Sequence, residues 1–579
     1  MLTNLRALKE DFLVEKWSLI AGCIALIICD ALQLFVPRII RTVVDDLTLG
    51  TMTQGTLLLY AGLILLISGS VCFLRYLWRY WLLGTAFRVE ENIRKKLFKH
   101  FQKLSVNYYA SAKTGDLMAH ATNDINQVRA ACGQGILMIV DTLFVGIACF
   151  ILMFLMNVRL TLYVLIPLVA TIFVIRGFDK SLRSRFERVQ EAFSDLTERA
   201  RENFAGIRVI KGYAQEEAQE NGFATASMDY LKKEMRLALL WSGFFPLISI
   251  GASIASAIVI IIGGRGVILN DFSIGSFVAF VSYLAMFTWP MMAIGWVINI
   301  LQRGEVSMGR INKILNTKPE IEDTADAVEK EISGDIEFRN LTYQYPDSDK
   351  PILQNISFHI PVGGTLAIVG RIGSGKTTIA NLIPRLLEPK EGEILIDETD
   401  VKKITLGSLR SQIGFVPQDT FLFSDSIREN ITFARPNITN KLVEKTAKIV
   451  QIHNQISTFT DKYSSLVGER GVMLSGGEKQ RTTIARAILA EPKILILDDC
   501  FSSVDTDTEE KILKEFKNIM NEKTCVIISH RISTVRDADE IIVLDEGTIA
   551  ERGTHEQLIK YNGIYADIYQ KQQLEESLK

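Results

Sequence analysis

Six long apolar segments constrain what this 579-residue chain can fold into. A helix needs about 20 apolar residues to cross the hydrocarbon core of a bilayer, and each segment reaches this length. We therefore predict six membrane-spanning helices. Their approximate ranges are 17–40, 56–82, 131–156, 158–178, 238–268 and 273–302.

The loops between these segments alternate in length and charge. Loops 41–55 and 157–159 are short and poor in lysine and arginine. Segments 83–130 and 179–237 are long and rich in both. Cytoplasmic segments of membrane proteins carry the excess of lysine and arginine. The sequence therefore predicts a multi-pass protein of the cell membrane, with the N-terminus and residues 303–579 in the cytoplasm.

The two long cytoplasmic segments are predicted to extend the membrane helices, because they contain few glycine or proline breaks. At about 1.5 Å per residue, some 25 residues would project roughly 37 Å from the membrane. Residues 107–117 and 213–223 interrupt these extensions, and we interpret them as short contact helices at the tips. Ordinary solvated helix hairpins are the alternative interpretation of the charge pattern.

The second half of the chain has the composition of a soluble domain. Residues 316–334 form a polar, charged linker. Short β-rich runs follow, and strands then alternate with helices, which favours a parallel α/β sheet. We predict a membrane domain over 1–315 and an α/β domain over 335–579. Lysine and arginine (64) nearly balance aspartate and glutamate (66), which argues against a nucleic-acid partner.

Residues 365–383 (TLAIVGRIGSGKTTIANLI) combine a buried strand, a glycine-rich turn and a helix. They match the pattern G-x-x-x-x-G-K-[ST], whose backbone N–H groups and helix N-terminus hold phosphates. Lys376 is predicted to reach the β- and γ-phosphates, and the Thr377 hydroxyl to hold Mg²⁺. The other residues of this loop that we expect to bind nucleotide are Gly370, Gly373, Ser374, Gly375 and Thr378.

A second buried strand, 494–499, has the sequence ILILDD and ends in two acids. Alone it is a weak signal, because any core strand can end in aspartate. In a chain that also has a phosphate-binding loop, Asp498 is predicted to hold Mg²⁺ through a water molecule. The fold is therefore expected to be an α-helical membrane domain fused to an α/β phosphate-loop nucleotide-binding domain.

Residues 474–489 (LSGGEKQRTTIARAIL) begin with a Ser-Gly-Gly turn at the start of a helix. Such a turn is a second anion-binding nest, although a plain helix cap is the alternative interpretation. One nucleotide does not need two nests from one chain. We therefore interpret this nest as serving a nucleotide held by another chain; it comprises Ser475, Gly476 and Gly477.

The order of these motifs resembles the ATP-binding cassette (ABC) family. LSGGEKQR lies downstream of GRIGSGKTT and just upstream of ILILDD, and VIISHR follows. Six N-terminal spans fused to one cassette resemble a half-transporter of the exporter type, and the resemblance covers nearly the whole chain. It implies an ATPase coupled to transport, ATP and Mg²⁺ as cofactors, and a second half-transporter as partner.

The resemblance also implies roles for single residues. Tyr345 matches the aromatic residue that stacks on adenine, with Tyr343 as the alternative. Gln418 matches the glutamine that senses Mg²⁺ and the γ-phosphate, and is thus an expected metal ligand. His530 matches the histidine that contacts the γ-phosphate. Residues 467–471 (VGERG) resemble the exporter loop that meets the coupling helices.

The family usually has glutamate where this chain has Asp499, at the position of the carboxylate that acts on the attacking water. A base must come within about 2.6–3.2 Å of its proton. With a fixed backbone, the missing methylene withdraws the carboxylate by roughly 1 Å, and such misplacements cost on the order of 10²-fold in rate. We therefore predict that this chain's own site binds ATP but hydrolyses it slowly, with Asp499, His530 and Gln418 as its catalytic residues.

An intact signature beside a shortened base is expected in one half of a heterodimer, which we favour over a homodimer. The slow site would combine this chain's Lys376, Asp498 and Asp499 with the partner's signature. The competent site would combine the partner's glutamate with this chain's nest.

The sequence constrains the cargo least, and we expect hydrophobic or amphipathic small molecules of the multidrug type. A lipid or peptide exporter, and a nucleotide-gated regulator or channel that does not pump, are the alternatives. Aromatic and methionine side chains are dense in the last span and suit varied hydrophobic cargo, although bundle packing or lipid contact explains them equally. They are Phe277, Phe280, Tyr283, Met286, Phe287, Trp289, Met291 and Met292.

Two carboxylates, Asp30 and Asp141, lie inside predicted spans. A carboxylate within the membrane is costly and indicates a functional site by default. We expect Asp141 either to meet cationic cargo or to pair with a neighbouring helix.

Overall fold

The computed structural model describes residues 3–346, 348–468, 474–520 and 522–577. The chain divides into two compact units. The first comprises Met1–Lys99 and Leu117–Asn316, and the second comprises His100–Asp116 and Thr317–Lys579. A short loop from the helical half of the sequence thus belongs to the C-terminal unit.

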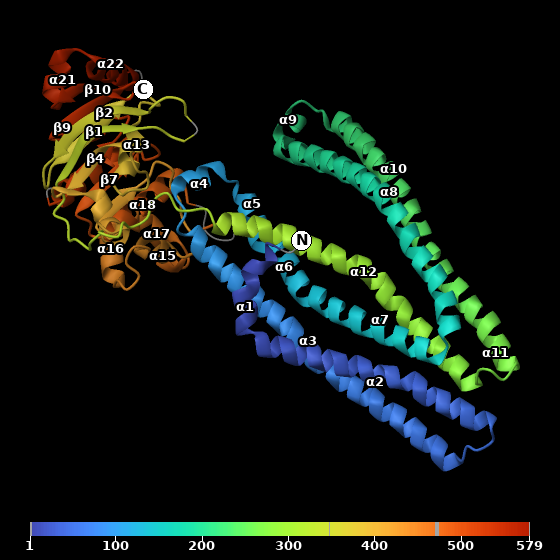
Figure 1. Cartoon of the computed structure of the whole chain (residues 1–579). Helices are drawn as coiled ribbons and strands as arrows, with labels where there is room; N and C mark the ends of the chain where they lie inside the picture. Colours follow the sequence, from blue (N-terminus) through green and yellow to red (C-terminus); the bar gives the residue numbers. More distant parts are fainter. Residues whose placement is uncertain (1–2, 347, 469–473, 521, 578–579) are drawn as a thin grey trace. The chain divides into compact units, whose positions relative to one another are not determined.

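The first unit is built of long helices, whose course can be followed in Figure 1. Several run well beyond a membrane-spanning length, as expected for helices with cytoplasmic extensions. The helices are α1 (Lys9–Val14), α2 (Lys16–Thr48), α3 (Gln54–Phe101), α4 (Val106–Ser111, in the second unit), α5 (Thr114–Ala119), α6 (Ile125–Ala130), α7 (Ile136–Met156), α8 (Val158–Ala205), α9 (Ile207–Gly212), α10 (Glu216–Ile258), α11 (Gly264–Ile268) and α12 (Ile274–Leu315), with π-helical turns at His120–Asp124, Ala131–Gly135 and Val259–Gly263.

Five helical segments within the described residues are long and apolar enough to cross a bilayer. A sixth apolar stretch, Val158–Thr171 at the start of α8, is shorter. These six stretches coincide in order and approximate position with the six predicted spans. The five longer segments are Lys16–Thr48, Gln54–Phe101, Thr114–Met156, Ser249–Ile268 and Ile274–Leu315.

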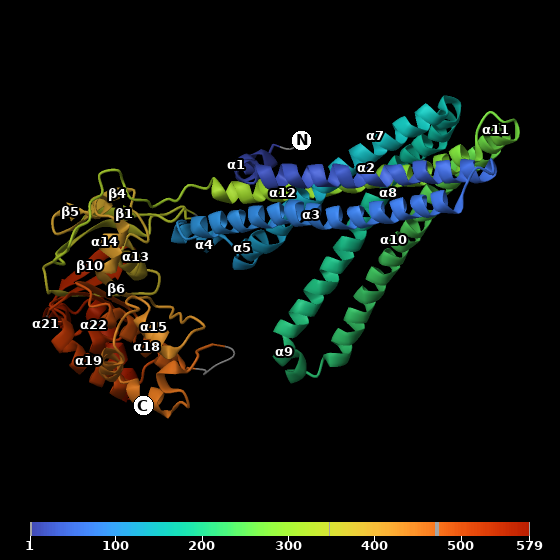
Figure 2. The same ribbon diagram turned by 90° about the horizontal axis from the view of Figure 1, so that it is seen from below.

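Helices α8 and α10 run side by side as a hairpin that α9 closes (Figures 1 and 2). Both views show the α9 end of this hairpin diverging from α7 and α12. The predicted contact helix at 213–223 was misplaced, because α9 occupies Ile207–Gly212 and most of that stretch begins α10. The chain turns first at Gly206 between α8 and α9, before the predicted stretch, and again within that stretch at Ala214, whose φ is 51°.

A core of buried apolar side chains joins α2, α7, α8, α10 and α12. Phe280 and Tyr283 of α12 lie inside it, and the Tyr283 hydroxyl donates a hydrogen bond to the Leu34 carbonyl oxygen at 2.9 Å. Four more of the eight candidate cargo side chains pack against this core, so bundle packing accounts for six of them. The four are Phe277, Met286, Phe287 and Met291. Trp289, by contrast, is 49% exposed.

The second unit contains two sheets. The four-stranded sheet has the order β2-β1-β4-β5 and is antiparallel. In the six-stranded sheet, β9, β3, β8, β7 and β6 are parallel neighbours and β10 is an antiparallel edge strand. The strands are β1 (Ile336–Tyr343), β2 (Leu353–Ile360), β3 (Thr365–Gly370), β4 (Glu391–Ile396), β5 (Thr399–Asp400), β6 (Ile413–Val416), β7 (Ile494–Asp498), β8 (Thr524–Ile528), β9 (Glu540–Asp545) and β10 (Thr548–Gly553).

Two cores hold the sheets of this unit together. One lies between the four-stranded sheet and one side of the six-stranded sheet, and the other packs helices against the opposite side. The described helices of this unit beyond α4 are α13 (Lys376–Leu382), α14 (Leu406–Ser411), α15 (Ile427–Thr432), α16 (Asn440–Ile449), α17 (His453–Thr458), α18 (Gly476–Leu489), α19 (Thr506–Met520), α20 (Ile532–Val535), α21 (His555–Tyr561) and α22 (Ile564–Ser577).

The predicted linker packs along the second unit as an extended strap. Val328 pairs with Ile404 as an isolated β-bridge, and Ile332 is buried in the core. Near the start of the strap, the Glu320 carboxylate accepts hydrogen bonds from Ser105 (3.1 Å) and Asn107 (2.9 Å), beside and within α4. Residues 317–334 of the predicted linker thus belong structurally to the second unit.

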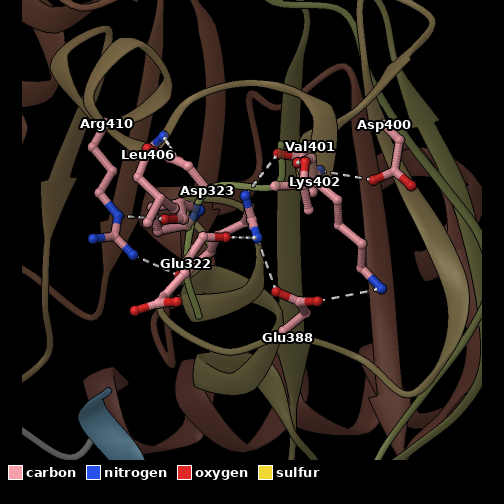
Figure 3. A network of polar contacts seen from close by, with 11 residues as sticks. Glu322, Asp323, Glu388, Asp400, Val401, Lys402, Leu406 and Arg410 are labelled. Atoms are coloured by element: carbon pink, nitrogen blue, oxygen red, sulfur yellow. Dashed lines mark hydrogen bonds and ion pairs between the residues drawn. The ribbon is translucent and has the colours of Figure 1, made fainter. Parts of the chain in front are cut away.

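The buried Arg385 guanidinium links the strap to the rest of the second unit. Its partners Glu322, Val401 and Glu388 are labelled in Figure 3. Only 2% of this residue is exposed. It donates hydrogen bonds to the carbonyl oxygens of Val401 and Glu322, both at 3.3 Å, and pairs with Glu388 at 3.0 Å. A charge so deeply buried is tolerated because each of these partners is an acceptor.

We expect Arg385→Met to destabilise the second unit by about 3 kcal/mol, because it leaves buried acceptors without a donor. For a domain of this size, such a loss lowers the unfolding midpoint by roughly 6–12 °C. Scanning calorimetry of the purified chain measures the midpoint. Arg339→Met is the matched control, since Arg339 pairs with Glu337 on an exposed surface and its loss should be undetectable. Equal midpoints for the two variants would contradict a structural role for Arg385.

Candidate nucleotide-binding site

The phosphate-binding loop connects β3 at the centre of the sheet to α13. Gly370 and Gly375 have φ of 156° and 100°. A Cβ at Gly370 would lie 2.3 Å from the Leu544 carbonyl oxygen, and one at Gly375 would lie 2.6 Å from a Leu353 methyl group. Glycine is therefore required at Gly375 both by conformation and by space, and at Gly370 by the close approach of β9.

The Lys376 side chain folds back over the loop. Its ammonium donates hydrogen bonds to the carbonyl oxygens of Gly370 (2.9 Å) and Arg371 (2.8 Å). Burial lowers the pKa of Lys376, and the nearby carboxylates of Asp498 and Asp499 partly oppose this shift. These neighbours keep a cation at the centre of the loop, where phosphates of a nucleotide would meet it.

A cleft of about 210 Å³ opens beside this loop. It brings together predicted site residues from the glycine-rich turn, from the end of β7, from the segment after β8 and from the segments after β1 and β6. Those that line it are Tyr345, Gly373, Gly375, Lys376, Thr377, Thr378, Gln418, Asp498, Asp499 and His530.

Two buried polar atoms at this site have no hydrogen-bond partner among the described residues. They are Oγ of Ser374 and Oδ2 of Asp498. The Asp498 carboxylate also accepts a hydrogen bond from the Thr377 hydroxyl. A hydroxyl and a carboxylate oxygen left unpaired fit a phosphate and an octahedral Mg²⁺ ion, respectively.

The described residues hold no cluster of three or more histidine, cysteine, aspartate or glutamate side chains suited to a metal. Mg²⁺ commonly takes one or two carboxylates and completes its shell with water and phosphate oxygens. The donor set present here, with Asp498 and the Thr377 hydroxyl side by side, is of that kind.

The surroundings of Asp498 and His530 shift the pKa values of both side chains. Burial raises the pKa of Asp498 to about 6, and the Asp499 charge adds to the shift. Burial and the Lys376 charge lower the pKa of His530, against the opposing effect of Asp499. His530 is therefore neutral at pH 7 and able to accept or donate a hydrogen bond.

The two tyrosines considered for adenine stacking lie in different environments. Tyr343 is buried in the core, and its ring meets that of Tyr345 edge to face at 5.0 Å. Tyr345 lines the cleft, and its hydroxyl lies 3.2 Å from the Thr378 hydroxyl. The geometry therefore favours Tyr345 over Tyr343 as the side chain available to a base.

The Ser-Gly-Gly nest lies at the start of α18 and is not among the residues that line this cleft. Ser475 caps the helix and forms a reciprocal capping box with Glu478. Ser475 and Gly476 are exposed, and a Cβ on Gly477 would lie 2.7 Å from the Ser503 carbonyl oxygen. Residues 469–471 of the predicted VGERG loop lie outside the described residues.

Sequence reasoning missed three isoleucines that line the cleft: Ile352, Ile372 and Ile528. Ile372 is 91% exposed and occupies a variable position of the phosphate-binding pattern. Its position between Gly370 and Gly375 could have indicated that it lies at the cleft. Ile528 ends β8 next to the acids of β7, which required knowledge of the strand pairing.

Two protein-family models match the chain: the ABC transporter transmembrane region over residues 19–291 and the ABC transporter domain over residues 353–502. The multidrug resistance-like ATP-binding protein MdlA of Escherichia coli (strain K12) is 37% identical over 97% of this chain and 96% of its own length. The chain belongs to the ABC transporter family.

Further comparisons specify the exporter architecture of this ABC transporter. The probable multidrug resistance ABC transporter ATP-binding/permease protein YheI of Bacillus subtilis (strain 168) is 37% identical over 95% of this chain and 94% of its own. A solved structure of a bacterial Atm1-family ABC exporter with ATP bound has a TM-score of 0.80 and 28% identity, covering 96% of this chain and 98% of that one.

Family membership confirms the predicted fold class, a helical membrane domain fused to an α/β cassette. The ABC transporter is a multi-pass membrane protein with a cytoplasmic nucleotide-binding domain. It is an ATPase that couples hydrolysis to export.

We expect Mg²⁺ to strengthen ATP binding less as the pH falls through about 6, the pKa of Asp498. Because this pKa is raised, a proton occupies the carboxyl at lower pH and must leave before Mg²⁺ can bind. At pH 5 the contribution of Mg²⁺ should be about tenfold smaller than at pH 7. Titrating ATP onto the purified chain, with Mg²⁺ or with chelator, measures this ratio. Asp498→Asn should remove the pH dependence that belongs to this group, and an unchanged profile would contradict the assignment.

Proposed function

We propose that this ABC transporter is one half of a heterodimeric exporter that moves hydrophobic or amphipathic small molecules of the multidrug type across the cell membrane. The names of MdlA and YheI, which describe those relatives as multidrug resistance-like and probable multidrug resistance proteins, support this cargo class. The alternatives are a lipid or peptide exporter and a nucleotide-gated protein that does not pump.

The main support for the heterodimer proposal is the fixed backbone of Asp499. Asp498, which precedes it, pairs with Ile528 in the sheet. The Asp499 N–H donates a hydrogen bond to the Ile528 carbonyl oxygen at 2.8 Å, and its φ of 45° is in the left-handed region. A backbone held in this way does not advance to compensate for a side chain one methylene short.

The placement of the signature supports a second chain. The cleft that contains Lys376 and Asp499 is not lined by Ser475, which lies exposed at the start of α18. In the proposed dimer, this nest closes over the nucleotide of the partner half. The partner's nest closes over Lys376 in the same way.

The α9 tip also supports a partner. Apolar side chains are exposed there, among them Tyr213, which is 76% exposed. Exposed apolar side chains gathered at one place are typical of protein interaction sites. The neighbouring exposed side chains are Phe204, Ile207 and Val209.

The proposed mechanism divides the work between the two halves. Lys376 and the loop N–H groups bind phosphates, Tyr345 stacks on the base, and His530 and Gln418 contact the γ-phosphate end. Thr377, Gln418 and Asp498 would hold Mg²⁺, which when bound neutralises charge that develops on the phosphates. Nucleotide binding favours the closed pair of cassettes, and this difference in affinity between two states drives the change in the membrane helices.

We expect Asp499→Glu to raise the ATPase rate of the chain purified without a partner by about 10- to 100-fold, because it returns the carboxylate to the attacking water. ATP affinity should stay within twofold. Asp498→Glu is the matched control, since it lengthens the adjacent Mg²⁺ ligand and should bring no gain. Brisk hydrolysis by the unmodified chain alone, or no gain from Asp499→Glu, would contradict the slow-site proposal.

ATP-dependent uptake into inside-out membrane vesicles tests the cargo class. Vesicles that contain this chain and its partner half should accumulate a hydrophobic dye but neither a fluorescent phospholipid nor a short peptide. Dye uptake should disappear with Lys376→Ala in both halves. Preferential uptake of the phospholipid or the peptide, or ATP binding with no uptake at all, would overturn the multidrug assignment in favour of one of the alternatives.

A further inference from the structure

Asp30 of α2 is a buried carboxylate in a membrane-spanning helix. It is 4% exposed, and its Oδ2 atom has no hydrogen-bond partner among the described residues. A carboxylate without a partner in an apolar bundle is costly, and such residues mark functional sites. Oδ2 of Asp30 thus has no counterpart among the contacts of the described residues.

Charged residues from two other helices act on Asp30. Asp141 of α7 and Arg75 of α3 both interact with it electrostatically, and Arg75 interacts with Asp141 as well. The Arg75 guanidinium donates its hydrogen bond to the Gln33 side-chain oxygen at 3.1 Å. None of the described ion pairs joins Arg75 to Asp30 or Asp141. Two carboxylates thus share the influence of one guanidinium.

Close in sequence to Arg75 and Asp141, two other buried polar atoms have no hydrogen-bond partner in the described structure: the Trp78 indole nitrogen and the Thr142 hydroxyl oxygen. Thr142 follows Asp141 directly, and Trp78 lies one helical turn after Arg75. The unpaired Asp30 atom is therefore part of a wider set of unsatisfied groups on α2, α3 and α7. Native interiors rarely leave such groups unpaired unless another molecule meets them.

One aromatic side chain of α12 contacts Asp141. The Trp289 indole interacts with the Asp141 side chain. Trp289 also packs edge to face against Trp296 at 5.8 Å, and both indoles are 49% exposed. The face of an indole attracts cations, and the attraction strengthens where water is excluded.

We propose that Asp30 and Asp141, with the Trp289 indole, form a binding site for a lipophilic monovalent cation inside the membrane domain. Two carboxylates beside a single guanidinium favour one additional positive charge, and the Trp289 indole suits an apolar, polarisable body. The Trp289 indole beside Asp141 favours an organic cation over a metal ion, because a hard metal ion prefers oxygen ligands. This inference rests on the proposed multidrug function and specifies the charge of its cargo.

Equilibrium binding to the complex of this chain and its partner in lipid nanodiscs tests the site. The probes are tetraphenylphosphonium, a permanent lipophilic cation, and triphenylphosphine oxide, a neutral compound of similar aromatic character. Asp30→Asn and Asp141→Asn should each weaken binding of the cation by about tenfold and change binding of the neutral compound by less than twofold. Asp46→Asn, near the C-terminal end of α2, is the control and should change neither.

Arg75→Gln should change cation affinity in the direction opposite to that of the aspartate variants. Removing the competing positive charge should strengthen cation binding by about threefold or more, which a loss of packing would not do. Cation affinity unchanged in both aspartate variants would overturn the site, as would an equal loss for cation and neutral compound. A complex that binds the neutral compound but not the cation overturns the site and leaves multidrug export standing. A complex that binds neither overturns the proposed cargo class and the site with it.

Discussion

Parallel pairing at the centre of the six-stranded sheet fixes the geometry on which the nucleotide site depends. Ile528 of β8 lies opposite Ile368 of β3 on one side and opposite Asp498 of β7 on the other. The glycine-rich turn after β3, the acids at the end of β7 and His530 after β8 therefore emerge at the same edge. The same pairing holds the Asp499 backbone, so the shortened side chain acts from a fixed position.

Local patterns in the sequence were sufficient to predict much of this site. Lys376 and Thr377 belong to a contiguous strand, turn and helix, and Asp498 ends an apolar run, so short-range spacing identified them. Ile352 and Ile528 were missed because strand pairing, a long-range property, brings them to the cleft. The choice between Tyr343 and Tyr345 likewise required their burial, which spacing alone does not give.

Membrane-spanning length is also a local property, so the approximate positions of the apolar helices could be read from the sequence. The position of α9 could not, because the chain turns at Gly206 and again at Ala214, and nothing in the charge pattern marks these turns. Composition likewise marked the strap around Val328 as a polar, charged linker. Ile321 and Ile332 are nevertheless buried, and backbone pairing between Val328 and Ile404 holds the strap in place.

The loop of residues 100–116 makes the cassette discontinuous in sequence. Ser105 and Asn107 donate to Glu320, so part of the C-terminal unit is encoded among the membrane helices. Exchanging residues 317–579 between two transporters of this family would separate Glu320 from its hydrogen-bond donors Ser105 and Asn107. A chimeric transporter that preserves these contacts must therefore take residues 100–116 and residues 317–579 from the same parent protein.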